Sequence, residues 1–155
     1  MRESYGQPDT YRLAAQWLRD CGEVSDWGGG LGAFGAYLPS STRYRVVDGT
    51  YQRPGQAAVE DLELFKESTE AIMLRHVLEL NPDWEYIVDN LLESFQRRAV
   101  VVTYTPPFTK VKSGWPVAAV PQGELAARLA PVLVRAEFVP TADLEHVYYL
   151  EKRVP

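Results

Sequence analysis

Two acidic residues and the glycines between them carry the clearest chemical signal in the sequence. Asp26 ends a short apolar run, glycines follow at positions 28, 29, 30 and 32, and Asp48 ends a second apolar run. A glycine backbone can turn sharply and approach a ligand closely, because no Cβ intervenes. The carboxylate that ends the second run can accept hydrogen bonds from two neighbouring hydroxyl groups, as on a ribose. Strand, glycine turn, helix, strand and acid together predict a nucleotide-binding βαβ unit.

Two ligand classes fit this glycine-rich segment. Residues 30–35 match G-x-G-x-x-G, the dinucleotide fingerprint. A second frame starts at Asp26 and takes the glycines at 28, 30 and 32. An acid repels a pyrophosphate in a poorly solvated cleft but attracts a cation, so we favour the second frame. A dinucleotide, and a glycine turn that binds nothing, are the alternatives.

The rest of the chain alternates apolar runs with helical patterns. This alternation predicts an α/β fold: a Rossmann-like, doubly wound, mainly parallel sheet with helices on both faces and a C-terminal antiparallel strand pair. Strands are expected at 23–26, 44–48, 57–62, 71–74, 99–104, 134–139 and 147–152, and helices at 9–21, 33–38, 82–98 and 124–133. Ligands of such sheets bind at the carboxyl ends of the strands, where both acids would lie.

The order of these motifs resembles that of class I S-adenosylmethionine-dependent methyltransferases. The frame from Asp26 resembles their first motif, Asp48-Gly49 the second and Asp61-Leu62 the third, while residues 75–84 resemble the segment after their fourth strand. The resemblance implies S-adenosylmethionine as cofactor. The cofactor-binding residues that it implies are Asp26, Trp27, Gly28, Gly30, Asp48, Gly49, Asp61, Leu62, Leu74 and Arg75.

The resemblance further implies methyl transfer to a hydroxyl, amine or carboxyl group of a small molecule or glycan. His76 is the candidate general base, since an imidazole titrates near neutral pH. Thr105-Pro106-Pro107-Phe108 differs from the amine-holding motif of DNA methyltransferases, because it follows the wrong strand and starts with threonine. The alternatives are a non-catalytic S-adenosylmethionine-binding module and an NAD-dependent oxidoreductase.

Length, net charge and cysteine content limit the number of domains, the partners and the location that we expect. A chain of 155 residues suits one domain, here with residues 1–8 as a flexible tail, and a net charge of −5 disfavours nucleic acid as a partner. The single cysteine, Cys21, fits a cytoplasmic location, and no residue set has metal-ligand spacing. No apolar run is long enough to enter a membrane as a spanning helix. Trp115 and the Tyr148-Tyr149 strand indicate a possible homodimer edge.

Overall fold

The computed structural model describes residues 8–49, 60–104, 120–140 and 144–153. Its helices are α1 (Pro8–Leu18), α2 (Trp84–Ser94) and α3 (Gln122–Leu129), with 3₁₀ turns η1 (Ala33–Tyr37) and η2 (Leu78–Leu80). Its strands are β1 (Glu23–Trp27), β2 (Arg43–Val47), β3 (Thr69–Arg75), β4 (Phe95–Tyr104), β5 (Leu133–Val139) and β6 (Glu145–Glu151).

The described strands form one sheet in the order β2-β1-β3-β4-β6-β5. β1 to β4 are mutually parallel, whereas β6 is antiparallel to both β4 and β5. The predicted α/β class, parallel sheet and closing antiparallel pair are therefore confirmed. The carboxyl ends of β1, β2, β3 and β4 all lie along the same edge of the sheet, because parallel strands run in one direction.

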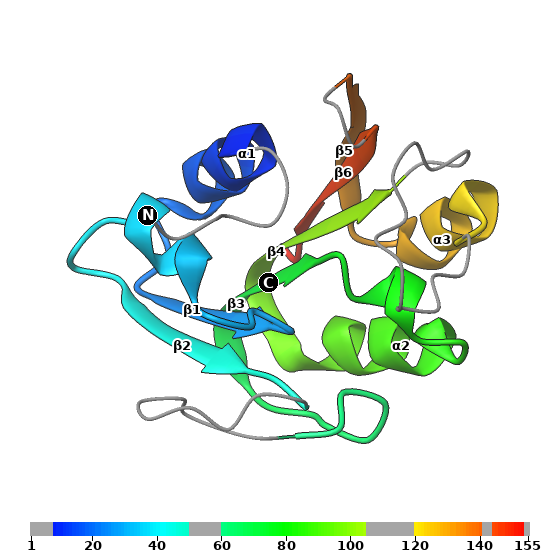
Figure 1. Cartoon of the computed structure of the whole chain (residues 1–155), viewed down its shortest axis with the longest axis horizontal. Coiled ribbons are helices and arrows are strands. Elements are labelled where there is room, and N and C mark those ends of the chain that lie inside the picture. Colours follow the sequence, from blue (N-terminus) through cyan, green and yellow to red (C-terminus); the bar gives the residue numbers. More distant parts are fainter. Residues whose placement is uncertain (1–7, 50–59, 105–119, 141–143, 154–155) are drawn as a thin grey trace.

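Helices cover both faces of the sheet, as predicted (Figure 1). Because side chains alternate along a strand, Met73 packs on the side of α1 and η1, while its neighbour Leu74 packs on the side of α2 and α3. Tyr148 and Tyr149 are likewise divided between the two faces, and they are only 2% and 0% exposed. The expectation that this pair forms a dimer edge is therefore wrong. Trp115 lies outside the described residues.

Two predicted helices differ in the structure. The segment expected as a helix at 33–38 is a 3₁₀ turn that starts after the left-handed Gly32. The helix expected over 82–98 ends at Ser94, and Phe95 already belongs to β4. Arg97 and Arg98 therefore do not close the helix. A cation does lie at the end of α2, since the ammonium of Lys152 donates to the carbonyls of residues 92 and 95.

The segment expected as a third strand, 57–62, is not a strand where it is described. Residues 60 and 61 have no regular secondary structure and 62–64 form a turn, while 57–59 lie outside the described residues, as do the loop segments 50–56 and 105–119. Across the described parts of the chain, every helix is too short or too polar to cross a membrane.

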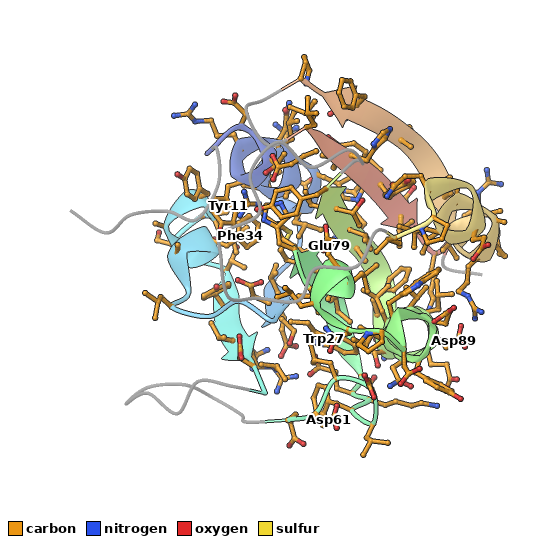
Figure 2. All side chains as sticks on the ribbon, turned by 45° about the vertical axis from the view of Figure 1, so that its right-hand side comes forward. Tyr11, Trp27, Phe34, Asp61, Glu79 and Asp89 are labelled. Carbon is orange, nitrogen blue, oxygen red and sulfur yellow. The ribbon has the colours of Figure 1, made fainter. Side chains whose placement is uncertain are left out.

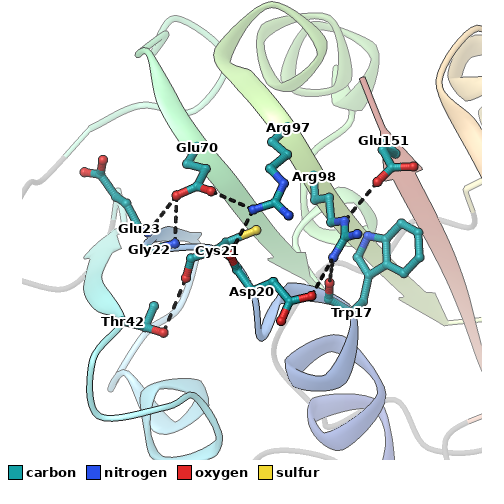
Figure 3. Close-up of polar contacts among 10 residues, drawn as sticks. All are labelled: Trp17, Asp20, Cys21, Gly22, Glu23, Thr42, Glu70, Arg97, Arg98 and Glu151. Atoms are coloured by element: carbon teal, nitrogen blue, oxygen red, sulfur yellow. Dashed lines mark hydrogen bonds and ion pairs between the residues drawn. The ribbon is translucent and has the colours of Figure 1, made fainter. Parts of the chain in front are cut away.

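A polar network lies at the edge of the sheet opposite the carboxyl ends of the parallel strands, where β6 ends (Figure 3). The Glu70 carboxylate accepts hydrogen bonds from the amide of Gly22 at 2.7 Å and from Arg97 at 3.0 Å. Arg98 donates to the Trp17 carbonyl and to Glu151, each at 3.0 Å. These contacts fasten the end of α1 to β1, β3, β4 and β6, which fixes the strands whose opposite ends bear the candidate site.

Candidate functional site

The glycine loop leaves β1 at the carboxyl edge of the sheet. Gly28, Gly30 and Gly32 have φ values of 73°, 53° and 73°, a left-handed backbone that glycine adopts without strain. The amide of Gly28 donates to the carbonyl of Val47 at 2.7 Å, which ties the loop to the end of β2. A Cβ at Gly28 would overlap Cγ2 of Val77, so this position requires glycine for space as well as for conformation.

Asp26 lies directly beneath this loop. Its side chain points to the α1 face, and the residue is 4% exposed. A Cβ at Gly29 would sit 2.5 Å from the Asp26 carboxylate, so the loop backbone covers that carboxylate closely. The hydroxyl of Tyr44 on β2 donates to Oδ2 of Asp26 at 2.5 Å. Burial raises the pKa of Asp26 to about 7, against the lowering effects of Tyr44 and Arg75.

Asp48 follows β2 and contacts the same loop from its other end. Its carboxylate accepts a hydrogen bond from the amide of Gly30 at 3.0 Å, and the residue is 6% exposed. The structure therefore brings together the two acids and the glycines that the sequence singled out. Gly49 continues the cluster, since a Cβ there would sit 3.0 Å from the carbonyl of Glu60. Glu60, the residue before Asp61, thus lies beside Gly49.

Asp61 and Leu62 occupy a turn that α2 supports. The Asp61 carboxylate accepts from the amide of Glu63 at 3.0 Å, and Asp61 lies exposed at the outer edge of the molecule (Figure 2). Leu62 is buried, and the side chain of Asn90 donates to its carbonyl at 3.0 Å. Asn90, which the sequence analysis did not single out, therefore fixes the position of this turn.

Trp27 and Leu74 lie in the core. Both side chains are 0% exposed on the α2 face, and the indole of Trp27 donates to Glu67 at 2.7 Å (Figure 2). Because side chains alternate along a strand, the Trp27 side chain lies on the opposite face of the sheet from that of Asp26. These two predicted residues can therefore border a cofactor only through their backbone.

Arg75 ends β3 inside a buried polar cluster. Its guanidinium donates to Glu145 of β6 at 3.0 Å and to the hydroxyl of Thr10 in α1 at 3.0 Å. It also lies 4.3 Å from the ring centre of Tyr11. Glu145 is fully buried; burial alone raises its pKa, but the interactions with His76, Arg75 and Thr10 hold that pKa below the usual range. The Arg75 side chain thus forms an ion pair within a cluster that joins α1, β3 and β6.

His76 follows immediately and reaches the same carboxylate. Its Nε2 lies 2.6 Å from Oε1 of Glu145, and its ring stacks on Tyr104 with centres 3.8 Å apart. His76 and Leu144, the residue before Glu145, have φ values of 54° and 49°, and they are the only described non-glycine residues with positive φ. Strained backbone of this kind persists where the surroundings impose it, often at functional sites.

Glu79 is another buried acid at this edge, besides Asp26, Asp48 and Glu145 (Figure 2). It is 1% exposed, and the amide of Tyr104 donates to its Oε1, while Oε2 has no hydrogen-bond partner within the described structure. Burial raises its pKa to about 7. No local sequence pattern marks Glu79, Tyr44 or Glu145 as members of the site. Their contacts come only from the tertiary arrangement.

Comparison with known proteins supports the fold. No protein-family model and no curated protein sequence matches the chain. Solved structures do match. Magnesium protoporphyrin IX methyltransferase (ChlM) from Synechocystis PCC 6803, with bound SAH, gives a TM-score of 0.73 at 13% identity over 94% of this chain and 83% of that chain.

Two further solved structures have a similar fold. N-methyltransferase NodS from Bradyrhizobium japonicum WM9, in complex with S-adenosyl-L-homocysteine, gives a TM-score of 0.73 at 13% identity over 97% of this chain and 89% of that one. Mitomycin 7-O-methyltransferase MmcR gives 0.68 at 14% identity over 93% of this chain and 53% of its own. The chain therefore has the fold of class I S-adenosylmethionine-dependent methyltransferases.

Proposed function

We propose that this protein binds S-adenosylmethionine and transfers its methyl group to a hydroxyl, amine or carboxyl group of a small molecule or glycan. The observation that carries the proposal is the placement of Asp26 and Asp48 on either side of one glycine loop, at the carboxyl ends of β1 and β2. This placement occurs in a fold whose solved relatives include methyltransferases with bound SAH.

The residues present fit this cofactor. Asp26 places a negative charge beneath the glycine loop. This charge stabilises the ammonium of the methionine moiety electrostatically, across the loop backbone that lies between them. Asp48 faces the loop from the end of β2, where its carboxylate can accept from the two ribose hydroxyls. The turn at Asp61 and Leu62 offers a carboxylate and a backbone amide to the adenine. Gly30 leaves room for the ligand, because a Cβ there would have no atom within 4 Å, whereas the space beside Gly28 is filled by Val77.

For methyl transfer, the protein mainly has to position the acceptor and the methyl donor. When bound, the methyl donor supplies an activated carbon: the acceptor's lone pair forms a bond to it while the carbon–sulfur bond breaks and its electrons stay on sulfur. The protein must hold the acceptor in line with that carbon. For a hydroxyl acceptor it must also remove a proton, which we assign to His76, whose imidazole is oriented by Glu145.

The dinucleotide alternative loses its main support in the structure. Gly35, the last glycine of the G-x-G-x-x-G match, faces the ring of Tyr44, since a Cβ there would lie 2.7 Å from two ring atoms. Packing against a protein side chain therefore accounts for this glycine without a pyrophosphate. A buried acid under the loop is also unfavourable for a diphosphate.

Isothermal titration with S-adenosylmethionine, S-adenosylhomocysteine and NAD tests the proposal. We expect saturable binding of the first two and none of NAD. Asp48→Ala should weaken both by about tenfold or more, because hydrogen bonds to a charged group are lost. Asp89→Ala is the matched control, since Asp89 is a surface acid of α2 that pairs with Arg128 at 2.6 Å (Figure 2).

Two results would contradict the proposal. Absence of heat with both sulfur ligands would refute cofactor binding itself. Tight binding without transfer of labelled methyl to any fraction of a cell extract would favour the non-catalytic binding module. In the second case, the assignment of His76 as a base would fall while the assignment of the cofactor would stand.

A further inference from the structure

Tyr44 of β2 contacts both Asp26 and the glycine loop. Its hydroxyl donates to Oδ2 of Asp26 at 2.5 Å. Its ring occupies the space beside Gly35 and Gly32, where added Cβ atoms would lie 2.7 Å and 3.6 Å from ring carbons. Phe34 packs edge-on against the same ring, with centres 6.3 Å apart. The Tyr44 side chain thus packs against the glycine loop and also hydrogen-bonds the Asp26 carboxylate.

We infer that Tyr44 is a positioning residue of the cofactor site, which holds the Asp26 carboxylate in the ionised form and orientation that attract the cationic end of S-adenosylmethionine. The inference rests on the proposed function and adds to it a residue and a pH dependence. Tyr44 lies within β2, four residues before Asp48, which directly follows the strand, so β2 positions two residues of the site.

The physical basis is the competition between burial and hydrogen bonding at Asp26. Burial favours the neutral acid, whereas a hydroxyl that donates to the carboxylate favours the charged form. The other groups that act on Asp26 are Arg75 from β3, which lowers its pKa, and Asp48, which raises it. Tyr11 of α1 is also close enough to interact with it electrostatically. The balance leaves the pKa of Asp26 at about 7.

The ionisation of Asp26 determines how cofactor affinity changes with pH. Below its pKa the Asp26 carboxyl is neutral and attracts a cation weakly, so affinity for the cofactor should rise as pH increases through about 7. Loss of the Tyr44 hydroxyl should raise the pKa of Asp26 by about one unit, the typical effect of one hydrogen bond to a charge. Affinity at pH 7 should then fall by about fivefold, because a smaller fraction of Asp26 is ionised.

The experiment is isothermal titration of S-adenosylhomocysteine between pH 5.5 and 8.0 with the whole protein and three variants. For Tyr44→Phe we expect the affinity step at a higher pH than in the natural protein, with a penalty that shrinks toward pH 8.0. For Asp26→Asn we expect weak binding without this step, which separates Asp26 from Glu79, whose pKa is also about 7. Tyr37→Phe is the matched control, because it removes the hydroxyl of a tyrosine in η1 whose ring stacks on Tyr11.

Several results would overturn the inference. A Tyr44→Phe profile that superimposes on the natural one, or that is weaker by the same factor at every pH, would show that Tyr44 only packs. A pH-independent affinity of the natural protein would do so without any variant, even if Tyr44→Phe failed to fold. If the natural protein bound neither S-adenosylmethionine nor its demethylated product, the proposed function would fall together with this inference.

Discussion

The guanidinium of Arg75 and the carboxylate of Glu145 form a buried ion pair at 3.0 Å, with side chains that are 5% and 0% exposed. The two residues lie 70 positions apart in the sequence and come from β3 and β6. Thr10 adds its hydroxyl to both partners, at 3.0 Å and 3.3 Å. This pair therefore joins α1 to the carboxyl edge of the sheet, and its carboxylate also lies 2.6 Å from Nε2 of His76.

Glu145→Ala should destabilise the protein by about 3–5 kcal/mol, because it leaves the Arg75 charge buried without its carboxylate. Glu145→Gln keeps an acceptor of similar shape and should cost less. Since the pKa of Glu145 is lowered in the folded protein, its contribution is present above the unfolded pKa, about 4.3, and is lost as the pH falls further. Urea unfolding at pH 7 and pH 3.5 measures both effects, and a loss below about 1 kcal/mol at pH 7 would contradict the ion pair.

Asp26→Asn should stabilise the protein at pH 8 while it weakens cofactor binding. The pKa of Asp26 is raised to about 7, so the folded state binds a proton more tightly than the unfolded state and loses stability as pH rises from about 4 to 7. Asparagine removes the buried charge and should gain on the order of 1–3 kcal/mol at pH 8, with no gain below pH 4. Urea unfolding across this range tests it, and equal stability of both proteins at pH 8 would count against a charged, buried Asp26.

The sequence predicts those parts of the fold and site that depend on local pattern. The strand at 99–104 follows from its β-branched run, and the glycine loop with Asp26 and Asp48 follows from spacing along neighbouring segments. Parallel strands bring their carboxyl ends to one edge, which is why these two acids meet at the loop. Secondary structure and chain direction were sufficient to infer this proximity.

Contacts between distant segments could not be predicted in the same way. Arg97 and Arg98 were expected at the end of a helix, yet they lie within β4, and Lys152 donates to the carbonyls at the end of α2 instead. A helix end requires a nearby cation, but the tertiary fold decides which residue provides it. Glu145 was missed for the same reason, because its partners lie in α1 and β3. Trp27 was expected at the cofactor, but strand alternation turns its side chain into the core.

Arg98 should contribute to stability through geometry that lysine cannot reproduce. Its guanidinium donates to the Trp17 carbonyl and to Glu151 at 3.0 Å each, and lies 4.8 Å from the Trp17 ring centre. Arg98→Lys should cost about 1–3 kcal/mol in urea unfolding, because one ammonium cannot keep both planar contacts. Arg43→Lys is the control, since Arg43 is 80% exposed and 3.9 Å from Glu23. Equal losses in the two variants would show that the network contributes little.

Gly28→Ala should be among the most damaging single substitutions at the site. The new Cβ would overlap Val77, and φ at this position is 73°, which costs alanine about 1 kcal/mol or more even in open space. The double variant Gly28→Ala/Val77→Ala relieves the overlap but not the backbone strain, and it creates a small cavity, so stability should return only in part. A double-mutant cycle in urea measures the coupling. If the two substitutions proved additive, the close packing of the glycine loop on Val77 would not be the reason for glycine at position 28.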